Sequence, residues 1–222
     1  MFFQDRKSAG HQLAARLKGR PLHNPLVLAI PGGGVVTGAV IAQELGADLD
    51  VVLSRRLRVS ERPELAIGAV SEDGSTYLND HTRKLVDVPE SFLDEERRYQ
   101  LNEIARCKAL FRNIRPQAPV AGRSVIVADD GIATGSTMIA ALRVVRPRNP
   151  YQLIVAVPVA PPDRLEEVRR LCDDVVCLHT PENFWAIGDF YTDFRLVTEE
   201  HAIELFRAGL AAVEPAGAGA NI

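Results

Sequence analysis

Short apolar runs alternate with amphipathic stretches along most of the chain. The apolar runs predict buried strands at 26–30, 50–53, 124–128, 153–157 and 174–178. The amphipathic stretches predict helices at 5–18, 35–45, 90–113, 136–145, 162–171 and 198–208. Strands that are apolar throughout and are separated by helices are typical of a parallel sheet covered on both faces. We therefore expect an α/β fold: a parallel sheet flanked by helices on both faces.

Two regions depart from this alternation. Residues 54–64 are dense in arginine, and we expect a loop there. Residues 65–78 predict two short strands around the turn signal Glu72-Asp73-Gly74. The chain shows no repeat and no internal linker, so we expect a single domain over residues 1–210. Residues 211–222 are rich in Ala and Gly, and we expect a disordered tail.

Composition narrows the class of protein. The chain has 222 residues, of which 46% are hydrophobic, which suits one α/β domain with a full core. The net charge of −3 argues against sequence-independent binding of nucleic acid. No apolar run reaches the roughly 18 residues of a membrane helix, and the first residues carry charges where a signal peptide is apolar. Three cysteines without a CxxC pair and five scattered histidines predict a reducing, cytoplasmic location and no zinc site.

The segment Val125–Thr137, with the sequence VIVADDGIATGST, carries the clearest chemistry. A buried strand leads to two neighbouring carboxylates, Asp129 and Asp130, and then to a turn of small residues that opens a helix. Carboxylates accept hydrogen bonds from sugar hydroxyls and help to hold hydrated divalent cations. The N–H groups of such a turn and the positive end of the helix attract phosphate. The pattern therefore favours a ligand that carries both a polyol and a phosphate.

A plainer interpretation of this segment is an ordinary strand-turn-helix connection with a polar turn. Acids at the carboxyl end of a parallel strand are common, so the carboxylates alone do not decide between the two interpretations of this segment. A Walker A loop fits less well, because that motif needs Gly-Lys before the Ser or Thr and this segment has no lysine.

Residues 125–137 resemble the signature of the type I phosphoribosyltransferases: apolar residues, two acids, two small or apolar residues, then Thr-Gly-(Gly/Ser)-Thr. Over roughly residues 1–200 the chain is most similar to a group of uncharacterised predicted phosphoribosyltransferases, with which it shares PELAIGAV (63–70) and VAVPVAPP (155–162). The resemblance implies the fold of that family with a small hood, formed here by the N-terminal segment and about 180–197. It also implies Mg²⁺ as cofactor and often a homodimer. The implied reaction transfers ribose 5-phosphate between phosphoribosyl pyrophosphate and a nitrogen nucleophile such as a nucleobase.

The resemblance gives each part of the motif a role. Asp129 and Asp130 would face the ribose 2′ and 3′ hydroxyls and orient the sugar, and they would hold Mg²⁺ directly or through water. The 5′-phosphate would be held by Ile132, Ala133, Thr134, Gly135, Ser136 and Thr137. No general base follows from the residues: Asp189 and a main-chain carbonyl both stay open.

Two more loops leave the carboxyl ends of predicted strands and should converge on the same site. Gly32, Gly33 and Gly34 form a turn that lets an anion approach the backbone, although it could serve only close packing. Relatives closest in pattern tend to carry Arg at the position of Gly32, so the strength of pyrophosphate binding is open. Arg55 and Arg56 match the basic pair that the family places after the next strand, where they would bind pyrophosphate and stabilise it as the leaving group. A solvated basic loop is the alternative.

Residues 181–191 contain the single tryptophan and several other aromatic residues. By resemblance, Phe184 or Trp185 would stack on the acceptor; the alternative is that these rings only seal a core.

A regulator that senses phosphoribosyl pyrophosphate without catalysis is the second functional hypothesis. Gly32 in place of a basic residue favours it, and the lack of an appended helix-turn-helix pattern argues against it. A nucleoside hydrolase fits less well, because no GxSxG nucleophile motif is present. The sequence does not identify the acceptor.

Overall fold

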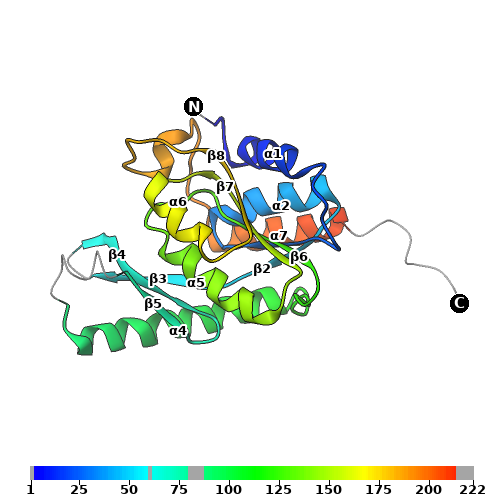
Figure 1. The fold of residues 1–222 in the computed structure, drawn as a ribbon. Helices are drawn as coiled ribbons and strands as arrows, with labels where there is room; N and C mark the ends of the chain where they lie inside the picture. Colours follow the sequence, from blue (N-terminus) through cyan, green and yellow to red (C-terminus); the bar gives the residue numbers. More distant parts are fainter. Residues whose placement is uncertain (1–2, 60–61, 80–87, 214–222) are drawn as a thin grey trace, which may run out of the picture.

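The computed structural model describes residues 3–59, 62–79 and 88–213 (Figure 1). A five-stranded sheet in the order β2-β1-β6-β7-β8 forms its centre, and every neighbouring pair of strands is parallel. The strands are β1 (Leu26–Ala29), β2 (Asp48–Val51), β6 (Ser124–Ala128), β7 (Gln152–Val159) and β8 (Asp174–His179). The α/β fold predicted from the sequence is confirmed.

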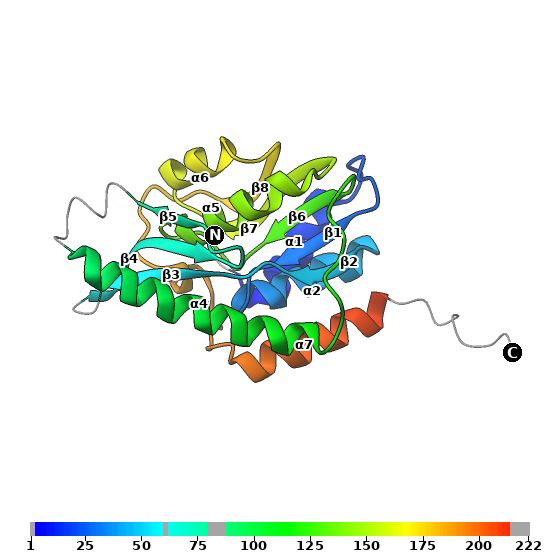
Figure 2. The ribbon, with the colours of Figure 1, turned by 90° about the horizontal axis from the view of Figure 1, so that it is seen from below.

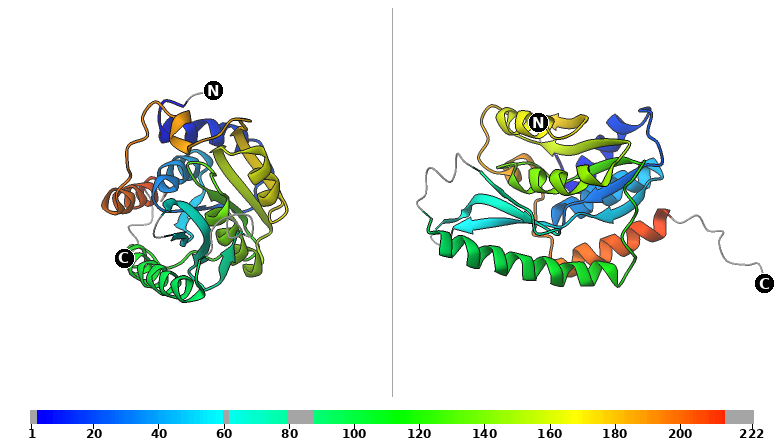
Figure 3. Two further views of the ribbon diagram at one scale, coloured as in Figure 1. Left: turned by 90° about the vertical axis from the view of Figure 1, so that its left-hand side faces the viewer. Right: turned by 60° about the horizontal axis from the view of Figure 1, so that its bottom comes forward.

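Helices cover both faces of this sheet, as the views in Figure 1 and Figure 3 show. Val27 and Ala29 of β1 belong to one hydrophobic core, and Leu26 and Leu28 belong to the other, because successive strand residues point to opposite faces. The first core is closed by α1 (Arg6–Leu17), α2 (Gly33–Leu45) and α7 (Glu199–Val213). The second is closed by α5 (Ser136–Val145) and α6 (Pro162–Arg169). Two short 3₁₀ helices, η1 (Arg146–Arg148) and η2 (Ile187–Phe190), follow α5 and β8 along the chain.

An arm of three antiparallel strands and one long helix projects beside the parallel sheet (Figure 2). Its elements are β3 (Ser54–Val59), β4 (Arg62–Ser71), β5 (Thr76–Leu78) and α4 (Glu90–Arg112). The predicted pair of strands around the turn at 72–74 is confirmed.

The predicted loop at 54–64 is wrong for Ser54–Val59, which forms strand β3 and pairs with β4, and for residues 62–64, which begin β4. Leu57 is buried, whereas Arg56 and Arg58 on either side of it are exposed, which is the alternation of a half-covered strand. The density of arginine conceals this short alternation. Residues 60 and 61 lie outside the described part of the chain.

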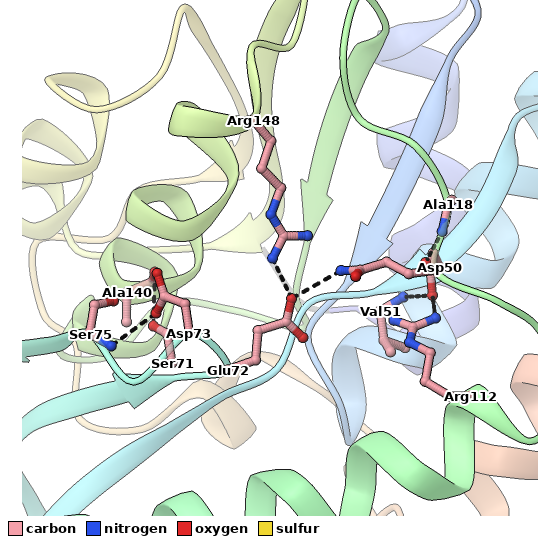
Figure 4. Close-up of polar contacts among 11 residues, drawn as sticks. Asp50, Val51, Ser71, Glu72, Asp73, Ser75, Arg112, Ala118, Ala140 and Arg148 are labelled. Carbon is pink, nitrogen blue, oxygen red and sulfur yellow. Dashed lines mark hydrogen bonds and ion pairs between the residues drawn. The ribbon is translucent and has the colours of Figure 1, made fainter.

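Buried polar contacts fasten the arm to the sheet (Figure 4). Asp50 on β2 accepts hydrogen bonds from Arg112 Nη1 at 2.8 Å and from the Ala118 amide at 2.7 Å. Glu72, in the turn between β4 and β5, accepts one from Arg148 Nη2 at 2.6 Å. These contacts hold the arm at the edge of the sheet, so that β3 begins where the parallel strands end.

The N-terminal segment lies beside residues 187–192, as Figure 1 shows. The Phe3 amide donates to the Phe190 carbonyl at 2.8 Å, and the Thr192 amide donates to the Phe3 carbonyl at 2.8 Å. Phe3 and Tyr191 share a small apolar cluster in the same place. These are the two segments from which the family resemblance predicts a hood. The predicted disordered tail at 211–222 is wrong for residues 211–213, which belong to α7, and residues 214–222 lie outside the described part of the chain. Within the described residues, no helix is long and apolar enough to cross a membrane.

Candidate functional site

A cavity of about 600 Å³ opens at the carboxyl ends of the central strands. The segments that follow Ile30, Leu53 and Ala128 all contribute to its wall, as expected for connections that leave one edge of a parallel sheet. Of the predicted site residues, those that line it are Gly32, Gly33, Arg55, Arg56, Asp129, Asp130, Ile132, Ala133, Thr134, Gly135 and Thr137. The wall also contains Arg6, Ile30, Pro31, Ser54, Arg58, Tyr99, Gln100, Gly131, Met138, Ile187, Phe194, Leu196 and Val197.

Four predicted residues are not part of this wall: Gly34, Ser136, Phe184 and Trp185. Ser136 is fully buried, and its hydroxyl accepts a hydrogen bond from the Thr134 hydroxyl at 3.3 Å. Phe184 stacks on Phe190 with ring centroids 5.4 Å apart, whereas 92% of Trp185 is exposed. The structure therefore gives Phe184 a packing contact and leaves Trp185 outside the cavity.

Asp130 lies on the cavity wall with most of its surface covered. Its Oδ2 atom accepts a hydrogen bond from Arg6 Nε at 2.6 Å, and both residues are only 9% exposed. Its main-chain carbonyl accepts a hydrogen bond from the Tyr191 hydroxyl at 2.6 Å. Asp130 is therefore held by α1 through its carboxylate and by residue 191 through its backbone.

Asp129, the neighbouring acid, is partly buried, and no Arg or Lys among the described residues forms such a contact with its carboxylate. Its Oδ1 atom accepts the Asp130 amide at 2.8 Å. Burial raises the pKa of the Asp129 carboxyl well above its ordinary value, and the negative charge of Asp130 raises it further. The positive charge of Arg56 acts in the opposite direction. The two acids thus share one site but have different electrostatic surroundings.

The turn after β1 approaches the acid pair closely. The Pro31–Gly32 peptide bond is cis, and Gly33 and Gly34, predicted as loop, are the first residues of α2. A Cβ atom on Gly34 would lie 2.9 Å from the Ala128 carbonyl oxygen. Glycine is therefore required for α2 to begin against the end of β6, and Gly34 serves this packing instead of lining the cavity.

The loop 131–135 leads into the N-terminus of α5. Gly135, the N-cap residue, has φ +79°, a left-handed conformation that glycine adopts without penalty. The first N–H groups of a helix lack partners inside the helix and attract anions. The Ile132 amide differs, since it already donates to the Val159 carbonyl at 2.9 Å. The Ile132 amide therefore anchors the loop to β7, and the later residues of the predicted phosphate loop are the ones that lie at the N-terminus of α5.

Basic side chains form another part of the wall. Arg55 Nε donates to the buried Gln100 Oε1 at 2.7 Å, and Gln100 Nε2 donates to Glu96 at 2.8 Å. Arg56 is exposed beside the cavity. Ser54 Oγ donates to the Thr137 carbonyl at 3.0 Å, which joins the start of β3 to the start of α5. The arm thus brings guanidinium groups to the cavity that the acids and the loop also line.

Comparison with known proteins places this cavity in a family. The model of the phosphoribosyl transferase domain matches residues 4–195. The chain belongs to the phosphoribosyl transferase family. Two relatives from Mycobacterium tuberculosis, in strains H37Rv and CDC 1551, are each 39% identical to it over 201 residues and are named "Putative phosphoribosyl transferase". The match covers 90% of this chain and 45% of each relative, so the chain spans about half their length.

A protein of known structure from a thermophile shares the fold. The crystal structure of TT1426 from Thermus thermophilus has 39% sequence identity to this chain and a TM-score of 0.77. The superposition covers 94% of this chain and 99% of the other chain. The fold is therefore shared over nearly the whole of both chains.

Several residues of the cavity wall have no feature in the sequence that would identify them as site residues. Arg6 is one of three Lys or Arg residues on the first helix, and its partner Asp130 is 124 positions away. Gln100 lies on an amphipathic helix, where a buried glutamine resembles any polar residue. The alternation of Leu57 with exposed arginines would have revealed β3, but nothing local identifies the partners that the tertiary fold supplies.

The acid pair fits a magnesium ion that is bound together with a substrate. Within residues 3–59, 62–79 and 88–213, no group of three or more His, Cys, Asp or Glu side chains could hold a metal by itself. Mg²⁺ commonly takes one or two carboxylates and completes its shell with water and substrate phosphate. Asp129 suits this role better than Asp130, whose Oδ2 already accepts a hydrogen bond from a cation.

Proposed function

We propose that this protein transfers ribose 5-phosphate between phosphoribosyl pyrophosphate and a nitrogen nucleophile, with Mg²⁺ as cofactor. One observation carries the proposal: the acid pair, the start of α5 and the arginines of β3 all line one cavity of about 600 Å³. Phosphoribosyl pyrophosphate carries a phosphate, ribose hydroxyls and a pyrophosphate, and each of these has a matching group among the three.

The donor would lie with its 5′-phosphate at the N-terminus of α5. Main-chain N–H groups at 133–137 and the Thr134 and Thr137 hydroxyls would hold the phosphate. Asp129 and Asp130 would accept hydrogen bonds from the ribose hydroxyls. The pyrophosphate would then reach the turn at Gly32 and Gly33 and the guanidinium groups of β3.

Catalysis would depend on positioning and on the stabilisation of charge. As the bond from ribose C1 to pyrophosphate breaks, positive charge develops on the sugar ring and negative charge on the leaving group. Arg55 and Arg56 would stabilise the pyrophosphate, and the carboxylates would stabilise the ring. Gln100 supports this geometry because it fixes Arg55 in the 2.7 Å hydrogen bond described above.

Mg²⁺, when bound with the donor, would offset the negative charge of the pyrophosphate. Asp129 is the residue that would hold it, directly or through water, with Asp130 behind it. The proposal does not require a metal site formed by the protein alone.

The acceptor would approach along the wall made by Ile187, Phe194, Leu196 and Val197. Leu196 is 86% exposed at this wall, and a large apolar side chain left exposed beside a polar cavity is a natural contact for a flat ring. This assignment replaces Phe184 and Trp185 as the proposed acceptor contacts. A homodimer remains a prediction from the resemblance.

Sensing of phosphoribosyl pyrophosphate without catalysis is the second candidate. Gly32 favours it, because the cavity wall there carries no side chain that could bind the leaving group. Transfer releases pyrophosphate, whereas sensing without catalysis does not, so the two candidates can be distinguished by measuring this product.

The test is to incubate the protein with phosphoribosyl pyrophosphate, Mg²⁺ and a panel of nucleobases and small amines, and to measure released pyrophosphate. Release that depends on one acceptor supports transfer. Calorimetric binding of the donor without any release supports sensing. Absence of donor binding would reject both candidates.

A further inference from the structure

We propose that Arg6 is a positioning residue that fixes the Asp130 carboxylate for the ribose hydroxyls and ties it to the acceptor wall. This inference rests on the function proposed above. Arg6 opens α1, far in sequence from the residues it touches, and belongs to none of the motifs found in the sequence.

The contacts of Arg6 hold its guanidinium group in three directions. Nε donates to Asp130 Oδ2 at 2.6 Å, and Nη1 donates to the Arg195 main-chain carbonyl at 2.9 Å. The guanidinium carbon lies 3.8 Å from the centre of the Phe194 ring, within the range of a cation–π contact. A planar group held at two edges and one face has little freedom to rotate, so it fixes the oxygen to which it donates.

This geometry assigns separate tasks to the two oxygens of Asp130. Oδ2 is engaged by Arg6, so Oδ1 is the atom that accepts a hydrogen bond from a ribose hydroxyl. A carboxylate with one oxygen fixed presents the other in a defined direction before the ligand arrives, which reduces the ordering cost of binding. Burial strengthens the effect, because both partners are only 9% exposed.

Arg6 also connects the sugar side of the cavity with the acceptor side. Asp130 belongs to the loop after β6, whereas Phe194 and the Arg195 carbonyl belong to the segment that continues into Leu196 and Val197. The Tyr191 hydroxyl makes a second tie, to the Asp130 main-chain carbonyl at 2.6 Å. Loss of the Arg6 side chain would therefore loosen the acid and the wall together.

Calorimetry with two ligands distinguishes positioning from general support of the fold. Phosphoribosyl pyrophosphate with Mg²⁺ carries ribose hydroxyls, and inorganic pyrophosphate with Mg²⁺ does not. We expect Arg6→Gln to lower the affinity for phosphoribosyl pyrophosphate by about tenfold or more. The affinity for inorganic pyrophosphate should change by less than about twofold. Arg6→Lys keeps the charge and should recover part of the loss. Arg16→Gln, an exposed arginine on the same helix, is the matched control and should bind both ligands as the wild type does.

The outcomes separate this inference from the proposed function. If wild type binds phosphoribosyl pyrophosphate and Arg6→Gln binds it equally well, or loses both ligands to the same extent, the positioning role is rejected and the function stands. If folded wild type does not bind phosphoribosyl pyrophosphate, the proposed function and this role both fail. Circular dichroism establishes folding; if Arg6→Gln does not fold, the same comparison is made with Arg6→Lys, for which an intermediate loss confined to phosphoribosyl pyrophosphate is expected.

Discussion

A Cβ atom on Gly33 would overlap Oδ2 of Asp130, the oxygen that accepts a hydrogen bond from Arg6. The N-terminus of α2 and the acid loop are thus in contact at a position where no side chain fits. At Gly32, one residue earlier, the nearest atom to a Cβ is the Val197 carbonyl oxygen at 3.5 Å. The first two glycines of this turn therefore differ. Gly32 leaves room in the cavity, and Gly33 lets the start of α2 approach the Asp130 carboxylate closely.

Gly33→Ala should displace the Asp130 carboxylate and weaken the binding of phosphoribosyl pyrophosphate by about tenfold or more, since a hydrogen bond to a charged group is worth about 1.5–3 kcal/mol. Gly32→Ala meets only ordinary van der Waals contact, so its loss should be smaller. Calorimetry on both variants measures the difference. Equal affinities would contradict the close contact between Gly33 and the acid loop.

Gly135→Ala should destabilise the protein by about 1–2 kcal/mol, because a left-handed conformation is unfavourable for a residue with a Cβ atom. The variant should also bind phosphoribosyl pyrophosphate less well, since this residue begins the helix that faces the phosphate. Gly46→Ala is the matched comparison: it has φ +59° at the end of α2, with open space around it. Urea denaturation should show similar losses of stability for both, and only Gly135→Ala should lose affinity.

Asp129→Asn should stabilise the ligand-free protein at neutral pH. Because its pKa is raised by burial and by Asp130, Asp129 binds more protons in the folded than in the unfolded chain above pH about 3.9. Stability then decreases as pH rises toward the folded pKa, and the full penalty of the charged carboxyl is present above it. The gain in melting temperature of the variant should vanish near pH about 3, grow as the pH rises above the ordinary pKa of about 3.9, and level off above the folded pKa of Asp129. A gain that is the same at every pH would show that charge is not the cause.

Arg112→Met should cost about 3–5 kcal/mol of stability, because the fully buried carboxylate of Asp50 loses its cationic partner. The exposed pair Arg146 and Asp173 supplies the comparison, and Arg146→Gln should cost less than about 1 kcal/mol. Chemical denaturation measures both. A small effect for Arg112→Met would mean that this pair contributes little to fastening the arm.

The central sheet and its helices follow from the sequence because local patterns specify them. β6 and α5 begin and end where the apolar runs and helical spacing predict, since strand and helix periods are properties of neighbouring residues. The acid pair and the small-residue turn that follows are identifiable for the same reason, as they are contiguous. Contacts between distant segments leave no such local pattern. The alternation in β3 is too short to be recognised among its many arginines.

Local patterns thus specify the parallel α/β sheet, the motif at 125–137 and the edge of the sheet at which its partners gather. Which groups meet across the cavity depends on the folded chain. The fold brings Arg6 to Asp130 and Gln100 to Arg55. It also brings Ile187, Phe194, Leu196 and Val197 to the cavity wall, whereas Phe184 and Trp185 are not part of it. These pairings result from helix packing and chain crossings over long separations, and no local period of the sequence records them.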